Sequence, residues 1–370
     1  MTRPPGIAVV GIDHRHAYGM AAHLIDAGAR LVGWWTEGEP GTLAGFVERF
    51  PDAPRVADRA ALLADGAVDL VLIADVPDRR AERAIEAMEA GRDVMVDKPG
   101  CTTPEDLERV RACVARTGRI WSIDFSERFE VPAVTRAEAL VREGAIGRVV
   151  QTLGLGPHRL NAATRPGWFF ERERSGGILC DIASHQIDQF LHFTGATDVE
   201  ITLATVDNVA HPGWPGLQDF GEVALEGRSG EGRARGYVRV DWFTPEALPT
   251  WGDGRLFLLG TEGTLELRKY VDVGGAEGTD HLLLVNGTRA ERIDASGARL
   301  PYFARLLEDV AARTATAMAQ DHAFRVTELA LRAQRLAEER RERPGSGTGE
   351  PGTSEPGTGG PHVGATGPSR

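Results

Sequence analysis

The first third of the chain alternates short apolar runs with amphipathic helical stretches, and this rhythm constrains its fold more than any other feature. Val68–Ala74 is a continuous apolar run, typical of a parallel strand covered on both faces. Asp78–Ala90 has the pattern of a helix, with Gly91 just past its end. Because strand–helix alternation with short connections produces right-handed parallel crossovers, we expect a doubly wound parallel sheet. The expected strands are Ile7–Val10, Leu31–Trp35, Val68–Ala74, Asp93–Val96 and Arg119–Ile123.

After Phe125 the rhythm changes, and strand-like segments cluster between Gly-rich turns. Clustered strands predict an α+β domain with an open mixed or antiparallel sheet. We therefore expect an α/β domain of the Rossmann type over residues 1–125 and an α+β substrate and oligomerisation domain over 126–342. Residues 343–370 are almost entirely Gly, Pro, Ser, Thr and Glu, which predicts a disordered tail. The later helices are expected at Ala133–Glu143, Ile178–Phe193, Tyr302–Ala319 and Val326–Arg341, and the later strands at Val149–Leu155, Glu200–Val206, Gly221–Leu225, Ala234–Trp242, Arg255–Gly260, Thr264–Leu267 and His281–Val285.

Composition excludes several classes of partner. A chain of 370 residues is long enough for two domains, and it carries a formal charge of −12 without a basic block. This balance argues against nucleic acid or an anionic membrane as a partner. The three cysteines are scattered, and neither a signal peptide nor a membrane-spanning run is evident. We expect a cytoplasmic protein with reduced thiols.

The turn after the first strand carries part of a dinucleotide-binding fingerprint. Gly11 is in place, but Asp13 and His16 stand where two further glycines are usual. Gly11, Ile12, Asp13 and His14 are candidate cofactor-binding residues, with backbone N–H groups at the helix start binding the phosphates. The alternative is an ordinary turn in which Asp13 caps the following helix.

His14 and His16 also permit a different reading. A His-x-His pair on one strand face can hold a divalent metal, which would suit a metal-dependent hydrolase built on a barrel. Such a barrel needs eight strand–helix units, and the region after Phe125 does not supply them. We therefore assign no metal ligand in the leading interpretation.

Two further strand ends carry candidate residues. Thr36 and Glu37 follow the second strand, where an acidic residue holds the ribose hydroxyls in NAD-binding sites. No Arg follows closely to receive a 2′-phosphate, so NAD is slightly favoured and NADP stays open. At the fourth strand, Asp97-Lys98-Pro99 places an ammonium group at the carboxyl edge of the sheet, where ligands bind in such folds.

The strongest motif extends from Ser175 to Asp188. Gly176 and Gly177 leave room at a helix start for a ligand or another backbone segment. On a continuous helix Asp181 and His185 lie one turn apart, and a carboxylate there raises the proton affinity of the imidazole and orients it. Such a pair suits general acid/base chemistry, although a solvated polar helix face is the alternative.

In combination these motifs resemble the Gfo/Idh/MocA family, named after glucose-fructose oxidoreductase and inositol dehydrogenase. Asp97-Lys98-Pro99 is similar to the family's Glu-Lys-Pro motif, and Gly176-Gly177 with Asp181 and His185 matches its second motif. The aromatic run at 168–170 is also similar, and the resemblance covers residues 6 to about 341. The first turn departs from the family pattern at Asp13 and His16.

The resemblance implies nicotinamide hydride chemistry, with NAD or NADP, on sugars, cyclitols or related polyols. Carried over by position, it implies that His185 exchanges the proton of the reacting oxygen, that Lys98 orients and polarises that oxygen, and that Asp181 contacts substrate and tunes His185. His158, Arg159 and Trp168 are further candidate substrate contacts. It also implies homo-oligomers formed through the C-terminal sheet. A binding or regulatory protein without turnover is the second hypothesis.

Overall fold

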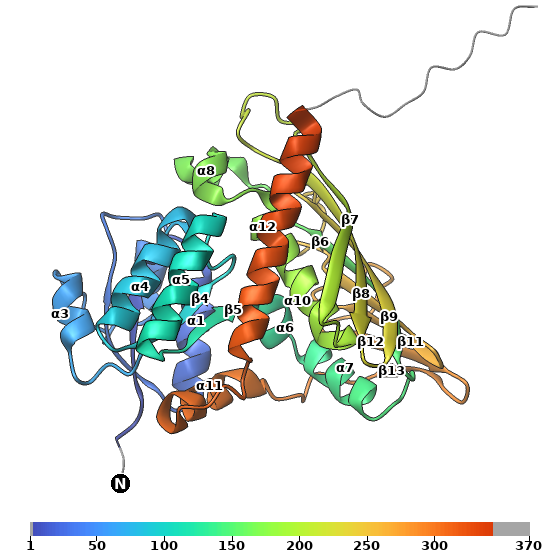
Figure 1. Cartoon of the computed structure of the whole chain (residues 1–370), viewed down its shortest axis with the longest axis horizontal. Coiled ribbons are helices and arrows are strands. Elements are labelled where there is room, and N and C mark those ends of the chain that lie inside the picture. The colour runs from blue at the N-terminus through green and yellow to red at the C-terminus, as the bar shows by residue number, and fades with distance from the viewer. Residues whose placement is uncertain (1–2, 343–370) are drawn as a thin grey trace, which may run out of the picture.

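The first part of the chain forms a five-stranded sheet in which all neighbouring strands are parallel. The computed structural model describes residues 3–342, so the predicted tail lies outside the described residues. The strand order β2-β1-β3-β4-β5 confirms the predicted doubly wound sheet. Four of the strands are buried along their whole length because helices cover both faces of the sheet (Figure 1). The strands are β1 Gly6–Val10, β2 Arg30–Trp35, β3 Leu70–Ile73, β4 Asp93–Asp97 and β5 Trp121–Asp124.

The helices of this part begin and end where the sequence places its caps. Thr103 precedes α5 and its side chain accepts a hydrogen bond from the Asp106 backbone N–H, while Pro104 occupies the first turn. Gly118 ends the same helix in the left-handed conformation, at φ +64°. The helices are α1 His16–Asp26, α2 Leu43–Arg49, α3 Arg59–Ala64, α4 Arg80–Glu89 and α5 Pro104–Thr117, with a 3-10 turn at Pro77–Arg79 before α4.

The second sheet has eight strands in the order β13-β12-β11-β10-β6-β9-β8-β7. Neighbouring strands are antiparallel except for β6 and β9, which are parallel, so the sheet is mixed, as predicted. The strand Ala290–Ile293 was not predicted, because it lies at the sheet edge with its first three residues exposed and shows no apolar alternation. The strands are β6 Val149–Pro157, β7 Asp198–Asp207, β8 Phe220–Ser229, β9 Gly232–Asp241, β10 Arg255–Gly260, β11 Gly263–Arg268, β12 His281–Asn286 and β13 Ala290–Ile293.

The helix predicted over Ile178–Phe193 is two helices. α9 (Ile178–Asp181) ends before Ile182, and α10 (Ala183–Thr194) begins after it. At the junction the Ser184 hydroxyl donates to the backbone carbonyl of Asp181 at 3.0 Å, a local bond of the kind that competes with the helix ladder. The break changes the direction of Asp181 relative to His185. Before it lie α6 Ser126–Phe129, α7 Pro132–Arg142 and α8 Arg172–Ser175, with 3-10 turns at Ala162–Thr164 and Gly167–Phe170.

The helix predicted over Tyr302–Ala319 is also shorter than expected. α11 (Pro301–Ala312) ends because the Asp309 carboxylate accepts the backbone N–H groups of Thr316 and Ala317, which folds the chain back. The last helix, α12 (Gln320–Glu342), then passes between the two sheets (Figure 1). Its Gln320 side chain bonds both backbone groups of Trp121, and its Gln334 side chain accepts from the Leu179 backbone N–H.

Within residues 3–342, no helix combines the length and the apolar character needed to cross a lipid bilayer.

Candidate active site

An ion pair joins the two parts of the chain at the carboxyl end of β4. Lys98 Nζ lies 2.6 Å from Asp181 Oδ1, and Lys98 is only 4% exposed. Burial acts to raise the pKa of the Asp181 carboxyl, but the Lys98 ammonium group outweighs it and holds the pKa below its usual value. Asp181 is therefore charged at neutral pH, and the structure brings these two predicted residues together.

His185 is a neutral imidazole with an unsatisfied nitrogen. It lies on α10 and is 1% exposed, and burial lowers its pKa to about 3. The positive charge of Lys98 acts in the same direction, whereas Glu127 opposes it. His185 Nδ1 is buried and has no hydrogen-bond partner within residues 3–342. A buried nitrogen in this state is available to accept a proton from a ligand or to donate one to it.

The predicted Asp181–His185 couple is wrong. The described part of the chain shows neither a hydrogen bond nor an ion pair between the two, because the helix breaks at Ile182. The carboxylate that acts on His185 is instead Glu127 on α6, which ion-pairs with Lys269 Nζ at 2.6 Å. Gln186 also donates to Glu127, at 3.0 Å.

Sequence reasoning missed this Glu127–Lys269 pair. The partners are 142 residues apart, and Lys269 simply follows an exposed-looking Glu-Leu-Arg stretch. One signal was available in the composition: Lys98 and Lys269 are the two lysines of the chain, against 42 Lys and Arg together. Both are buried. Arginine supplies the other 40 of these 42 side chains, and both lysines occupy interior positions.

The first strand–helix turn has a geometry that needs Gly11. Its φ is +72°, and a Cβ there would lie 2.4 Å from Asp75 Cβ. The residue preceding α1 is Arg15, and no side chain caps the helix, so the alternative in which Asp13 caps it is wrong. Burial and the nearby Asp75 carboxylate raise the pKa of Asp13 to about 6.

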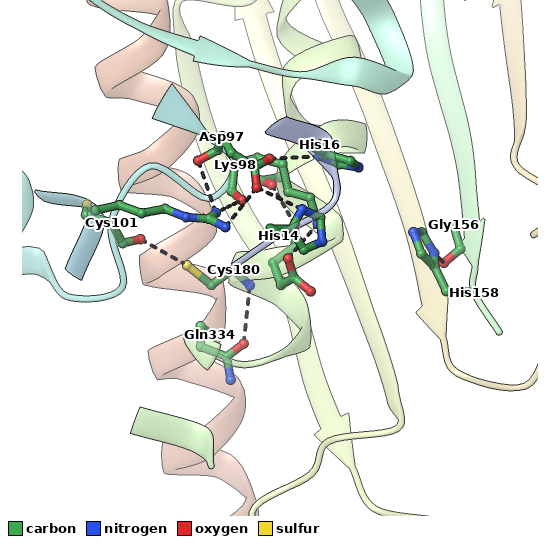
Figure 2. Close-up of polar contacts among 12 residues, drawn as sticks. His14, His16, Asp97, Lys98, Cys101, Gly156, His158, Cys180 and Gln334 are labelled. Carbon is green, nitrogen blue, oxygen red and sulfur yellow. Dashed lines mark hydrogen bonds and ion pairs between the residues drawn. The ribbon is translucent and has the colours of Figure 1, made fainter. Parts of the chain in front are cut away.

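His14 and His16 both point their Nδ1 atoms at Asp97, at 2.9 and 2.8 Å (Figure 2). Their ligand atoms lie within 4.8 Å of one another, which is close enough for a metal ion. However, the buried Arg80 guanidinium lies 2.8 Å from Asp97 Oδ2 and already balances its charge. Although burial opposes it, Arg80 holds the pKa of Asp97 well below its usual range, and burial lowers that of His14 to about 4. We therefore assign this cluster to polar contacts around the Asp97 carboxylate, among them its hydrogen bond with His16 Nδ1.

The end of β2 fits the ribose of a nucleotide. Thr36 is 4% exposed, and its hydroxyl oxygen is buried without a partner in the described residues. The exposed Glu37 carboxylate pairs with Arg79, and Arg83 lies 3.6 Å away. The sequence showed no nearby Arg, because both arginines come from the segment after β3 and reach Glu37 only in the folded chain. A hydroxyl without a partner and a carboxylate that accepts hydrogen bonds are groups that could bind the hydroxyls of a nucleotide ribose.

The remaining predicted substrate contacts fall into different places. His158 contacts Trp242 edge-on and Trp251 at a tilt, with ring centroids 5.3 and 4.5 Å away, and burial lowers its pKa to about 4. Figure 2 shows it apart from the His14–His16 group. Arg159 instead donates to the backbone carbonyls of Pro245 and Leu248, so it fixes that loop. Trp168 is half-buried and packs toward Phe169. Neither tryptophan beside His158 was singled out from the sequence.

The comparisons with known families cover both parts of the chain. The family described as "Oxidoreductase family, NAD-binding Rossmann fold" matches residues 6–125, and the GFO/IDH/MocA C-terminal domain matches residues 134–266. A crystal structure of an oxidoreductase from Erwinia carotovora atroseptica is 44% identical, with a TM-score of 0.86. The match covers 90% of this chain and 98% of that one.

Curated relatives match over shorter stretches. The 1-carboxy-3-chloro-3,4-dihydroxycyclohexa-1,5-diene dehydrogenase of Comamonas testosteroni is 30% identical over 49% of this chain and 45% of its own length. The levoglucosan dehydrogenase of Pseudarthrobacter phenanthrenivorans is 32% identical over 55% of this chain and 52% of its own. The chain thus spans about half the length of these curated relatives. With both domains matched in order, and a solved relative matched along nearly its whole length, the chain belongs to the Gfo/Idh/MocA family of oxidoreductases.

Proposed function

We propose that this chain is an NAD(P)-dependent dehydrogenase that moves a hydride to or from the carbinol or carbonyl carbon of a sugar, cyclitol or related polyol. The observation that carries this proposal is the contact of Lys98 with Asp181, one residue from each part of the chain. Two relatives are dehydrogenases of dihydroxylated or sugar-derived rings by name, which supports the same class of substrate.

The residues that would hold the cofactor are those at three strand ends. Gly11, Ile12, Asp13 and His14 form the turn after β1, Thr36 and Glu37 follow β2, and Asp97, Lys98 and Pro99 follow β4. The bound cofactor supplies a nicotinamide carbon that accepts or gives the hydride. Glu37 favours NAD over NADP, because its carboxylate suits ribose hydroxyls and repels a 2′-phosphate.

The chain's own groups handle the proton and the developing charge. The neutral His185 imidazole accepts the hydroxyl proton when the substrate is oxidised and returns it in the reverse direction. The Lys98 ammonium group hydrogen-bonds the reacting oxygen and stabilises negative charge that develops on it. Asp181 fixes the position of Lys98 and accepts a hydrogen bond from a second substrate hydroxyl.

The test measures cofactor reduction by absorbance, with NAD+ and NADP+ in separate reactions against a panel of aldoses, aldonates, uronates and inositols. Turnover of at least one polyol that is lost in His185→Ala supports the proposal. Cofactor binding detected by tryptophan fluorescence without turnover of any polyol would favour the non-catalytic binding protein. If none of NAD+, NADH, NADP+ and NADPH binds, the proposal that the chain uses a nicotinamide cofactor is wrong.

We also propose that the chain self-associates through the outer face of its eight-stranded sheet. Leu259 and Val285 point outward there and are 42% and 52% exposed. Paired apolar sheet faces are a common basis for homodimers. A smaller sedimentation coefficient in Val285→Glu than in the parent chain would support this interface.

The three cysteines are buried free thiols, which favours a reducing compartment such as the cytoplasm.

A further inference from the structure

Arg165, in the segment after β6, is held in place by two hydrogen bonds and two aromatic contacts. Its guanidinium group donates to the backbone carbonyls of Leu160 and Arg159, at 2.9 and 3.2 Å. The same group stacks over the rings of Phe169 and Trp242, at 4.5 and 5.0 Å from their centroids. Two carbonyls and two aromatic faces thus fix a planar cation in one orientation, which is the condition for strong binding of a planar anion.

No carboxylate within residues 3–342 forms an ion pair with Arg165. Three other cations of this region are paired: Lys98 with Asp181, Arg80 with Asp97, and Lys269 with Glu127. A half-buried guanidinium without an anion is costly, and proteins keep such groups mainly where a ligand completes them. Arg165 is therefore the site's uncompensated charge on the side of the second sheet.

Two neighbours relate Arg165 to the candidate active site. Trp242, on which it stacks, also contacts His158, and the Asp181 carboxylate opposes the effect of burial that lowers the pKa of Arg165. His185 and His158 are neutral near pH 7, since burial lowers their pKa values to about 3 and 4, so they carry no positive charge that would attract an anion. Arg15, which also has no ion-pair partner in the described part of the chain, precedes α1 at the helix end proposed to bind the cofactor phosphates. Arg165 belongs to the opposite wall.

Resting on the dehydrogenase function above, we propose that Arg165 binds an anionic group of the substrate, so that the substrate is a polyol acid or polyol phosphate rather than a neutral sugar. The planar fork of arginine matches the two oxygens of a carboxylate or a phosphate. In the bound state Arg165 holds the anion, while Lys98 and His185 address the reacting hydroxyl at another carbon of the same molecule.

The experiment compares matched neutral and anionic probes on the chain saturated with NADH. D-Glucose, D-gluconate, D-glucuronate and D-glucose 6-phosphate are titrated and binding is followed by fluorescence, with turnover of each measured using NAD+. The variants are Arg165→Met, which keeps the packing and removes the charge, and Arg165→Lys, which keeps the charge and loses the fork. Arg109→Met is the control, because Arg109 is an exposed residue of α5 paired with Asp106.

We expect at least one anionic probe to bind about 10-fold or more tightly than glucose, the scale of a charge-assisted hydrogen bond. Arg165→Met removes this preference, Arg165→Lys restores part of it, and Arg109→Met keeps it. Gluconate and glucuronate against glucose 6-phosphate distinguish a carboxylate from a phosphate. Equal or tighter binding of glucose, or binding of no anionic probe, overturns the proposal. A loss of NADH affinity in Arg165→Met, with unchanged probe preference, also overturns it by assigning Arg165 to the cofactor.

Failure of this inference can be distinguished from failure of the proposed function. If neutral polyols are oxidised and their anionic counterparts are not, the dehydrogenase function stands and the role of Arg165 falls. If no polyol of either kind is oxidised, the function itself is wrong.

Discussion

Lys98 Nζ and Asp181 Oδ1 are 2.6 Å apart, although one follows the first sheet and the other ends a helix of the second part. Because the proposed chemistry uses the Lys98 ammonium group and the neutral His185 imidazole on the same reacting oxygen, we expect Lys98→Ala and His185→Ala each to lower kcat by about 100-fold or more. Steady-state kinetics measures the loss, and NADH titration establishes that the cofactor still binds. A rate near that of the parent chain in either variant contradicts the assigned roles.

Removal of the Arg80–Asp97 ion pair is expected to lower the stability of the folded chain strongly. Both groups are buried, so Arg80→Met leaves an uncompensated carboxylate in the interior and lowers the free energy of unfolding by about 3–5 kcal/mol. Arg79→Met is the matched control, because Arg79 pairs with the exposed Glu37 and its loss costs about 1 kcal/mol or less. Urea unfolding measures both. Equal stability of the two variants would show that Asp97 does not depend on Arg80, and would reopen the metal-ligand reading of His14 and His16.

We predict that Glu37 sets which nicotinamide nucleotide the chain prefers. In Glu37→Gln the repulsion of a 2′-phosphate disappears, and Arg79 and Arg83 are released to bind it. We expect the ratio of kcat/KM for NADP+ to that for NAD+ to rise about 10-fold or more. Glu39→Gln, two residues along on the exposed loop, keeps the original ratio. An unchanged ratio in Glu37→Gln would place the adenosine ribose elsewhere.

The buried imidazole of His185 makes stability depend on pH. In the unfolded chain it takes up a proton near pH 6.5, whereas in the folded chain burial lowers the pKa to about 3. Its contribution is therefore present above pH 6.5 and is lost as the pH falls toward 3. Between pH 6 and pH 5 the parent chain should lose up to about 1.4 kcal/mol per pH unit more than His185→Gln. Parallel curves of unfolding free energy against pH would show that folding does not shift the pKa of His185.

The sequence predicted the first sheet strand by strand because its strands are covered on both faces. Val71 and Leu72, like Val94 and Met95, are wholly buried, so their sequences read as unbroken apolar runs. Lys98 could be placed for the same reason, since it follows such a run at the sheet's carboxyl edge. The edge strand at Ala290–Ile293 has no such cover, and its sequence carried no signal.

What the sequence could not predict depends on contacts between distant segments. Helical periodicity put Asp181 beside His185, but one hydroxyl bond from Ser184 to the carbonyl of Asp181 accompanies a break in the helix between them. Glu127, which acts on His185 instead, owes its charge to Lys269, 142 residues away. Neither relation leaves a trace in local patterns.

The chain's two side-chain amines, on Lys98 and Lys269, are both inaccessible, whereas its abundant guanidinium groups occupy the remaining cationic positions. An amine-specific acylating reagent will therefore leave the side chains of the folded protein nearly unmarked. Any acyl group that mass spectrometry finds on Lys98 shows that the Lys98–Asp181 contact between the two parts of the chain opens transiently. Bound cofactor and substrate should slow that labelling, which gives a direct readout of occupancy without any need to know the reaction.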